Sequence, residues 1–337
     1  MQNSKPEKQK GVALITVLFM LALATVIVSG LVTLLDTNMQ RSSSTMESEE
    51  AYLLCLSGEE LARQLLAADY KSNPQIDHTH EKWAEGQVLK IDNGYAEISI
   101  QDAQGKFNIN NLNGVNGITN PNAKLIFQRL VNEAIGDPVL SKNIADEMAD
   151  WLDIDTTTGV EEADYLAEPI PYRPPNSNIT DISELIWLKD VDQEIYKAIH
   201  QGLFSSLIAL PESTSVNINT ATPEVIAALN DNISLDQAVG IVQTIRSKEE
   251  GYTASAAKAQ FPLLGAADLV ETSDYFEVKV RAKFADHYAF LTTILKRDHK
   301  ANGTINVISR DRSGRFIFPF SKDYNSNGNS KDYEFEI

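Results

Sequence analysis

The stretch KGVALITVLFMLALATVIVSGLVTLLD, residues 10–36, decides how the chain is built. Its central part, Val12–Leu35, carries no charged residue, and about 20 residues of helix are enough to cross the hydrocarbon core of a bilayer. Three lysines lie in the ten residues before Gly11, and Asp36 follows the apolar run. This asymmetry places the first residues in the cytoplasm and the bulk of the chain on the other side of the membrane.

Three kinds of N-terminal segment have this composition. A cleaved secretory signal has a shorter apolar region that ends in small residues, and this run is long and has no clear site of that type. An uncleaved signal anchor agrees well with the hydropathy. The third kind is the leader of type IV prepilins, which is removed before the apolar run. Gly11 stands at that junction, and cleavage there would leave Val12 as the first residue.

The helical pattern continues beyond the membrane boundary, which favours the prepilin interpretation. No proline occurs between Pro6 and Pro74, and ESEEAYLLCLSGEELARQLLA, residues 47–67, keeps apolar residues at helical spacing. A helix over 12–68 would be about 85 Å long. We expect one half of it in lipid and the other half packed on a globular domain, which is the anatomy of a pilin.

Thr16 is the fifth residue after the expected cleavage site, where pilins and most pseudopilins carry a glutamate. A carboxylate inside a bilayer costs several kcal/mol unless it is paired. The usual partner is the N-terminal amine of a neighbouring subunit. A subunit with threonine there needs no such neighbour above it, so it is suited to the end of a filament.

The composition excludes several function classes. A net charge of −18 argues against general affinity for nucleic acid or anionic lipid. Cys55 is the single cysteine, and its place in the apolar pattern predicts a buried, inert thiol. The sequence has no G-x-S-x-G, Walker or dinucleotide motif, and His78 and His80 lack an evident third metal ligand. We therefore expect no catalytic residues and no enzymatic activity.

The remaining chain alternates between strand and helix patterns. The segment QVLKIDNGYAEISI, residues 87–100, predicts two strands around an Asp-Asn-Gly turn, and Phe107 and Ile109 predict the start of a third. Strand patterns return at residues 274–284, 288–297 and 304–311. The intervening block has helical patterns at 122–136, 141–152, 181–188, 192–203, 223–229 and 235–246.

This order predicts an α+β fold in which the strands form one antiparallel sheet against the N-terminal helix. The helical block is then a large domain inserted into a sheet loop. The expected division is as follows: leader 1–11, N-terminal helix 12–70 with a transmembrane part at 12–35, sheet 85–110 and 272–318, inserted α-domain 111–271, and polar tail 319–337.

Several segments together resemble general secretion pathway protein K, the large minor pseudopilin of bacterial type II secretion systems. They are KGVALITVL, DAQGKFNINNL, WLDIDTTTGVEEADYL followed by PYRPPN, ISELIWLKDVD and SVNINTATPEVIAAL. The resemblance runs in order along most of the chain. It implies a type IV pilin-like fold with an inserted α-domain and processing by prepilin peptidase with methylation of Val12. Thr16 agrees with this family, which lacks the glutamate.

The resemblance also implies location and partners. The protein would be anchored in the bacterial inner membrane by a single pass, with its bulk in the periplasm. It would cap or initiate the pseudopilus beside minor pseudopilins of the I and J types. The major pseudopilin, prepilin peptidase and the inner-membrane secretion platform would be further partners, and nucleic acid would not.

An acidic loop lies inside the expected α-domain. Nine acidic and no basic residues occur between Lys142 and Arg173, which suits either a solvated loop or a calcium site built from carboxylates. The spacing departs from an EF-hand, because Gly159 comes one residue late and an aspartate replaces the last glutamate. The resemblance favours structural calcium. The candidate ligands are Asp153, Asp155 and Glu161 or Glu162, ahead of Asp164.

VNINTATPEVIAALNDNISLDQAVGIVQTIR, residues 216–246, predicts a helix-hairpin-helix unit, with Thr220 as a candidate cap. Such units bind DNA backbones with nearby cations, but Asp231 and Asp236 stand in those places here. We therefore interpret it as helix packing or a protein contact. Two alternatives to a pseudopilin stay open: a signal-anchored periplasmic binding domain, and a competence-type minor pilin that handles DNA.

Overall fold

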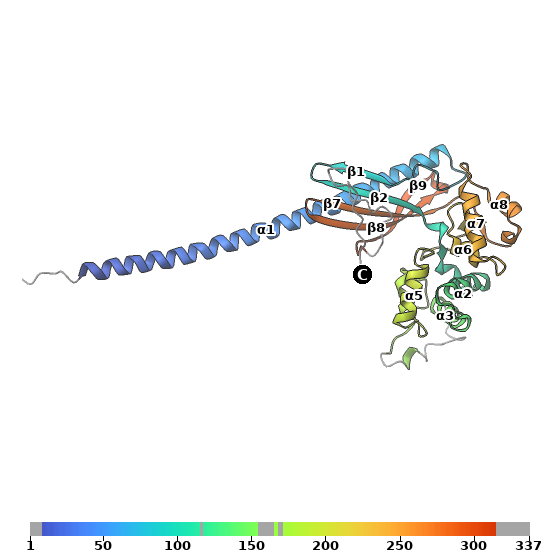
Figure 1. The fold of residues 1–337 in the computed structure, drawn as a ribbon, viewed down its shortest axis with the longest axis horizontal. Coiled ribbons are helices and arrows are strands. Elements are labelled where there is room, and N and C mark those ends of the chain that lie inside the picture. Colours follow the sequence, from blue (N-terminus) through green and yellow to red (C-terminus); the bar gives the residue numbers. More distant parts are fainter. Residues whose placement is uncertain (1–8, 115–116, 154–164, 168–170, 315–337) are drawn as a thin grey trace, which may run out of the picture.

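The fold is described by a computed structural model that covers residues 9–114, 117–153, 165–167 and 171–314. A single helix, α1 (Gln9–Ser72), projects far from the rest of the molecule (Figure 1). With 64 residues it is about 96 Å long. The predicted continuity of the helix from the apolar segment into the globular part is confirmed, and the helix ends just before Pro74.

The second half of α1 packs on a five-stranded antiparallel sheet in the order β1-β2-β7-β8-β9. The strands are β1 (Gln87–Ile91), β2 (Gly94–Asp102), β7 (Tyr275–Phe284), β8 (His287–Asp298) and β9 (Thr304–Asp311). The predicted hairpin and the three returning strands are confirmed. Strands from both ends of the chain therefore meet at the β2–β7 pair, where Ile98 lies opposite Val280.

One apolar core joins α1 to this sheet, and we call this unit the pilin body. Alternate residues of the strands turn inward, as a two-residue period requires, and they meet the apolar stripe of α1. Gly58 allows α1 to approach the sheet closely, because a Cβ there would lie 2.8 Å from Cγ1 of Val280. Cys55 is fully buried beside it, as predicted. The main contributors are Leu54, Cys55, Ala62, Leu66, Ile98, Val278, Val280 and Leu291.

The block between β2 and β7 forms a second core, and we call it the α-domain. It lies beyond the C-terminal end of α1 (Figure 1). Its helices are α2 (Pro121–Ile135), α3 (Pro138–Leu152), α5 (Gln193–Leu203), α6 (Pro223–Ala228), α7 (Leu235–Arg246) and α8 (Ala254–Gln260). Short strands link them: β3 (Phe107–Asn108) with β4 (Leu207–Ile208), and β5 (Val216–Asn217) with β6 (Leu269–Val270).

Three local predictions differ from the structure. Phe107 begins a strand, but it pairs with Leu207 in parallel inside the α-domain and not with the main sheet. Residues 182–187 form a 3-10 helix in place of an α-helix. The cap of α6 is Thr222, whose hydroxyl accepts a bond from the Val225 amide, because Thr220 uses its hydroxyl to donate to Asp102.

Candidate functional site

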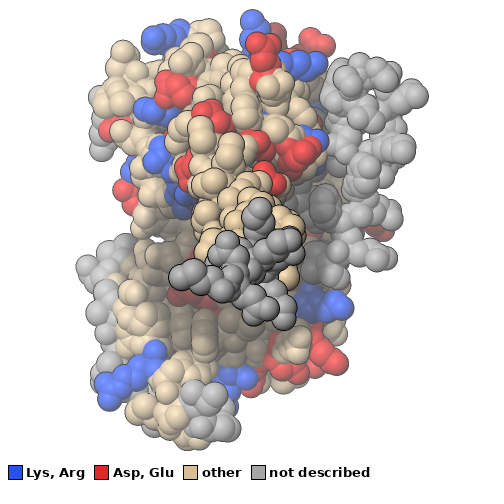
Figure 2. Space-filling view, turned by 90° about the vertical axis from the view of Figure 1, so that its left-hand side faces the viewer, with Lys and Arg blue, Asp and Glu red and all other residues tan. Residues whose placement is uncertain are grey.

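The first half of α1 is an exposed apolar surface. Every residue of Val12–Leu35 is exposed, and an 18-residue window there has a mean hydropathy of 2.7. Viewed from its N-terminal end, the apolar segment forms a tan area at the centre, and both signs of charge are scattered over the body behind it (Figure 2). By length and composition this segment is able to cross a membrane.

The three threonine hydroxyl groups in the apolar segment are bonded within the helix. Thr16 donates to the carbonyl oxygen of Ala13 at 2.9 Å, and Thr25 and Thr33 bond carbonyls three and four residues earlier. Because these donors are satisfied locally, they cost little in lipid. Thr16 thus lies in the apolar segment without a charge. Gly11 and Val12, the expected cleavage and methylation positions, lie close to the N-terminal end of α1.

Between the apolar segment and the pilin body, α1 carries an exposed stripe of three large side chains. Met39, Met46 and Leu53 are 70%, 66% and 52% exposed and are spaced by seven residues, so they share one face of the helix. Where the stripe reaches the sheet, Leu53 and Leu89 help line a shallow groove between α1 and β1. This surface is suited to packing another long helix beside α1.

The structure places one of the five predicted metal ligands. Asp153 is 8% exposed and caps the C-terminal end of α3, its amide donating to the carbonyl of Ala149. A carboxylate is unfavourable there, because a helix C-terminus is electrically negative. The other four candidates, Asp155, Glu161, Glu162 and Asp164, lie outside the described residues.

Aromatic residues hold both ends of the acidic loop against α3. The Tyr165 ring is fully buried and packs edge-on against Trp151 at a centroid distance of 5.7 Å. Tyr172 packs on Tyr165 at 5.2 Å, and its hydroxyl donates to the Trp187 carbonyl. The described residues at the two ends of the loop, Asp153 and Tyr165, therefore both lie at the C-terminal end of α3.

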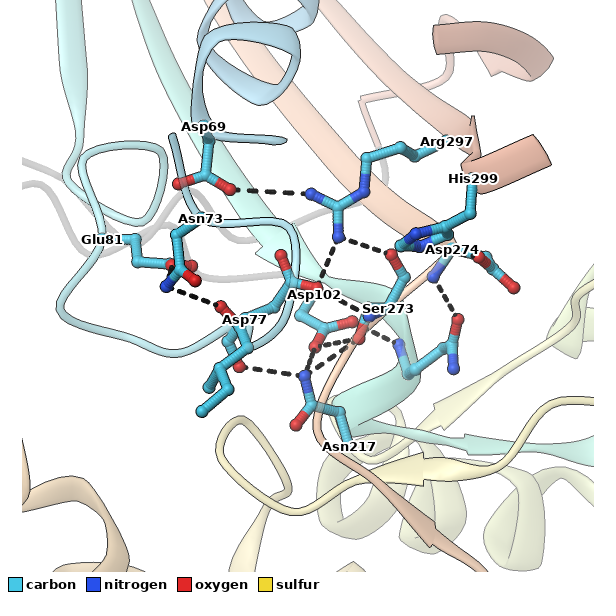
Figure 3. A network of polar contacts seen from close by, with 12 residues as sticks. Asp69, Asn73, Asp77, Glu81, Asp102, Asn217, Ser273, Asp274, Arg297 and His299 are labelled. Carbon is cyan, nitrogen blue, oxygen red and sulfur yellow. Dashed lines mark hydrogen bonds and ion pairs between the residues drawn. The ribbon is translucent and has the colours of Figure 1, made fainter. Parts of the chain in front are cut away.

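A buried polar cluster joins the α-domain to the pilin body, and we call it the joint (Figure 3). Arg297 of β8 is at its centre and is 1% exposed. Its guanidinium forms ion pairs with Asp77, in the loop after α1, and with Asp69 near the end of α1, at 3.6 Å for the latter. It also donates to the Ser273 carbonyl at 2.8 Å.

Asn217 brings the α-domain into the joint. Its amide nitrogen donates to the Asp77 carbonyl, to Asp102 at the end of β2, and to the Ser273 hydroxyl, over distances of 2.8–3.1 Å. Asp102 also accepts bonds from Ser273 and Thr220, both at 2.6 Å. Residues from four distant parts of the sequence therefore close one hydrogen-bond network around Arg297.

The carboxylates of the joint are less acidic than usual. Burial raises the pKa of Asp69 to about 6, and the negative charge of Asp77 adds to this effect. Burial likewise raises the pKa of Asp102 to about 6 and of Glu81 to about 7. Asp69, Asp77 and Glu81 have one oxygen each within 4.8 Å of one another. Since Arg297 already pairs with two of them, we interpret this group as a structural joint and not as a metal centre.

Two asparagine motifs organise the α-domain, and no pattern used above predicted them. Asn-Ile-Asn occurs at 108–110 and again at 217–219. In both, the first asparagine accepts a bond from the amide two residues on and reaches distant chain with its own amide group. Asn108 donates to the Glu212 carbonyl at 2.8 Å and accepts from the Leu210 amide at 3.0 Å. The repeated motif is the signal that would have pointed to them.

The one basic residue of the helix-hairpin-helix unit, Arg246, is bonded within the chain, as is Arg129 beside the unit. Arg246, at the end of α7, donates to the carbonyls of Thr220 and Ala221. Arg129 of α2 pairs with Asp231 in the turn between the two helices. Val225, Ile226, Ala238 and Ile245 are buried in the α-domain core, as the predicted apolar face requires. This arrangement serves helix packing.

The helix, the sheet and the inserted α-domain together define a class of protein. A long helix with an exposed apolar half and a half packed on an antiparallel sheet is the architecture of pilin-like subunits. The α-domain inserted between β2 and β7 is the feature that sets this subunit apart.

Comparison with known proteins identifies the family within that class. Family models described as type II secretion system protein K match residues 105–204 and 216–279. The chain is 30% identical to type II secretion system protein K of Pseudomonas aeruginosa, over 90% of this chain and 92% of that protein. It is 26% identical to the protein K of Pectobacterium carotovorum, over 91% and 97% of the two chains. The chain therefore belongs to the type II secretion system protein K family.

A solved structure shares the fold. The match is to a chain of the GspK-GspI-GspJ complex from the type 2 secretion system of enterotoxigenic Escherichia coli. The TM-score is 0.71 at 23% identity, covering 81% of this chain and 99% of that one. The predicted α+β fold, a long helix and an antiparallel sheet with an added helical domain, is confirmed.

Proposed function

We propose that this chain is a non-enzymatic minor pseudopilin that occupies the tip of the type II pseudopilus, where it initiates or caps the filament and supports protein export. The position of the α-domain carries this proposal. It lies beyond the end of α1 that points away from the membrane segment (Figure 1). A subunit stacked above along the filament axis would meet this bulk, whereas the membrane-proximal side of α1 is clear.

Thr16 supports the same position. A subunit inside the filament uses a membrane-buried carboxylate to pair with the amine of a neighbour, since an unpaired charge there is costly. Thr16 carries no charge and is bonded within its own helix. The subunit therefore requires no such neighbour, as expected at an end.

The partners of the proposal are other pilin-like subunits. The structural neighbour was solved in complex with GspI and GspJ, and we propose equivalent minor pseudopilins as partners here. The stripe of Met39, Met46 and Leu53 supplies an apolar helix face outside the membrane segment for such a contact. The major pseudopilin and the inner-membrane platform complete the proposed assembly, with the α-domain in the periplasm.

Labelling of isolated pseudopili tests the tip position. A tag inserted in the turn between α6 and α7, at Asp231, should mark one end of each filament in electron micrographs. The major pseudopilin, tagged as a control, should be marked along the whole length. Label from this chain along the filament would contradict the proposal. Deleting the chain should reduce both filament number and secretion.

Processing is proposed to remove residues 1–11 and to methylate Val12. The intact mass of the membrane-extracted protein measures this directly. The expected mass is that of a chain starting at methylated Val12, and Gly11→Ala should leave the leader in place. Gly30→Ala, at a helix position where a Cβ meets no atom within 4 Å, is the matched control. A wild-type chain that starts at Met1 would instead indicate a signal anchor.

We also propose that the acidic loop holds structural calcium. The candidate donors Asp153, Asp155, Glu161, Glu162 and Asp164 are all carboxylates, which suit this ion. Asp153 fits the proposal because it is buried at a helix C-terminus, where a nearby cation would offset an unfavourable charge. Bound calcium would neutralise the repulsion between these side chains. Asp153 would then fix the loop to α3.

Calcium titration of the melting temperature tests this site. Calcium should raise the melting temperature of the wild type, and replacing Asp153 and Asp155 by asparagine should abolish the rise. Glu133→Gln, an exposed carboxylate on α2, serves as the control and should keep it. A calcium-induced rise that persists in the double variant would remove these two residues as ligands.

A further inference from the structure

The α-domain and the pilin body have separate apolar cores, and the chain crosses between them at two neighbouring places. One is the 3-10 turn Ala103–Gly105 after β2. The other is the segment before β7, where the Asp274 amide donates to Oε1 of Gln104 at 2.6 Å. Two short crossings side by side form a natural hinge, because few backbone dihedral angles must change for the α-domain to move. The buried apolar cluster at this boundary is small: Ala103, Ile208, Leu210 and Tyr275.

The joint holds this hinge closed, and Asp77 is its central link. The Asp77 carboxylate pairs with Arg297 of the pilin body and accepts a bond from the Ser273 amide at 2.7 Å. The backbone amide of Asp77 donates to the Glu271 carbonyl at 2.8 Å, and its carbonyl accepts from Asn217 of the α-domain at 3.1 Å. A change in the charge of the joint therefore acts directly on the contact between the α-domain and the pilin body.

The joint contains more acidic than basic groups (Figure 3). Its four carboxyl groups are 10% exposed or less, and they belong to Asp69, Asp77, Glu81 and Asp102. Arg297 supplies one positive charge, so full ionisation would leave three negative charges in excess. Asp69 and Asp77 each keep a buried oxygen without a hydrogen-bond partner among the described residues. Buried carboxylates this close cannot all stay ionised, so the closed joint retains protons.

The neighbouring titratable groups leave this excess in place. His78 lies 3.8 Å from Glu81, but burial lowers the pKa of its imidazole and favours the neutral form. Asp274 and His299 pair with each other at 3.1 Å. Burial raises the pKa values of three carboxyl groups, those of Asp69, Glu81 and Asp102. The closed joint therefore binds more protons than an open joint, in which water solvates the carboxylates; His78 opposes this effect as one group against three.

We infer that the α-domain is hinged on the pilin body and that loss of protons from the joint releases it. In the closed form, the contacts of Asp77 with Arg297 and Asn217 hold the α-domain in the orientation seen in Figure 1. For each proton that the closed joint holds and the open joint does not, the ratio of closed to open molecules falls about tenfold per pH unit. The α-domain is thus fixed in mildly acidic surroundings and released in alkaline ones, while α1 stays packed on the sheet.

Pulsed EPR distances in the full-length chain in detergent test the hinge. Spin labels at Ser57→Cys on α1 and Gln243→Cys on α7, both at exposed positions, report the separation of the pilin body from the α-domain. We expect one narrow distance at pH 5 and a broader distribution at pH 8. A second pair, Ser57→Cys with Asn306→Cys on β9, lies within the pilin body and should give the same distance at both pH values. Cys55 takes up no label, because burial raises the pKa of its thiol to about 12.

Conservative variants test whether the carboxyl groups of the joint control the hinge. Asp69→Asn combined with Glu81→Gln removes two negative charges but keeps the side-chain size and the acceptor oxygens. The distance between the two labels should then stay narrow at pH 8, whereas ordinary structural damage would broaden it. Glu85→Gln, at an exposed position in the loop before β1, is the matched control and should respond to pH like the wild type.

Three outcomes would overturn the inference. An unchanged distance distribution between pH 5 and pH 8 in the wild-type chain would mean that the α-domain is not released. An equally large response to pH in the variant with Asp69→Asn and Glu81→Gln would exclude these carboxyl groups as the cause. Broadening of the pair within the pilin body would assign the change to unfolding of that unit and not to a hinge.

Discussion

The pilin body and the joint are held together by different chemistry. In the pilin body, α1 meets the sheet through apolar side chains, and Gly58 allows a close contact. In the joint, the α-domain meets the pilin body through Arg297, Asp77, Asp102 and Asn217. Apolar packing tolerates small changes of side chain. Removing one member of a buried charge network, in contrast, lowers the free energy of unfolding by several kcal/mol, because another charge is left buried without a partner. The two regions should therefore respond differently to mutation and to pH.

Removing the central cation of the joint should have the largest effect. Arg297→Met keeps much of the side-chain volume but leaves Asp69 and Asp77 without their counter-charge, at a cost of about 3–5 kcal/mol. Urea unfolding of the full-length chain in detergent measures this loss. Arg63→Met is the matched control. That arginine pairs with Glu60 on α1, and the two side chains are 37% and 54% exposed, so its loss should cost clearly less.

Equal losses in these two variants would mean that the joint is no more sensitive than a partly exposed ion pair. The contrast between the two regions would then have no energetic basis.

Overpacking the pilin body should have the second-largest effect on the free energy of unfolding. Gly58→Ala places a methyl group 2.8 Å from Val280 and 2.9 Å from Ile98, so α1 must shift from the sheet, at a cost of about 1–3 kcal/mol. Gly240→Ala on α7 is the control, because a Cβ there meets nothing within 4 Å. That variant should be as stable as the wild type or gain up to about 1 kcal/mol from helix propensity. A neutral Gly58→Ala would contradict the close packing.

The pilin body could be predicted from the sequence, whereas the joint could not. The 3.6-residue period of α1 and the two-residue period of the strands are local patterns, so the pilin body follows from reading along the chain. The joint is assembled from Asp77, Asp102, Asn217, Ser273 and Arg297, and no local pattern links positions so far apart. The short β3 is a similar case, because its pairing with β4 depends on how the α-domain closes.

Among the candidate site residues, Thr16 lies in the exposed apolar half of α1 and Asp153 at the end of α3, and their predicted roles stay predictions. The cap at Thr222 was missed because two threonines precede Pro223, and only the bond from Thr220 to Asp102 distinguishes them.

The two Asn-Ile-Asn motifs allow a test within the α-domain. Asn217→Ala removes three bonds into the joint, whereas Asn108→Ala removes bonds to the 210–214 segment of the α-domain itself. Each loss leaves buried partners unsatisfied and should cost about 1–3 kcal/mol. Only Asn217→Ala should make the chain near the joint accessible to limited proteolysis while the α-domain remains intact. Cleavage in both variants at the same sites would contradict this separation.

A change of pH should have the smallest effect on the free energy of unfolding. The sign of this effect should differ between the joint and the pilin body. Joint carboxylates have raised pKa values, about 6 for Asp69 and Asp102 and about 7 for Glu81. The folded chain binds more protons there than the unfolded chain, so this contribution is complete below about pH 4 and is lost as the pH rises through 6–7. In the pilin body, burial opposes ionisation of Glu277, but the charges of Lys106 and Lys279 outweigh it and lower the pKa to about 2.

The Glu277 carboxylate therefore contributes its full stabilisation of the folded chain above about pH 4.3. This contribution is lost as the pH falls toward 2. Trp83 is a natural reporter for the joint, since its indole donates to Glu81 at 2.7 Å. With Trp151 and Trp187 replaced by phenylalanine, its fluorescence should change between pH 5 and 8, while the strands of the pilin body keep their circular dichroism over that range. A fluorescence change only below pH 4 would mean that the joint titrates like the pilin body, and the electrostatic half of the comparison would fail.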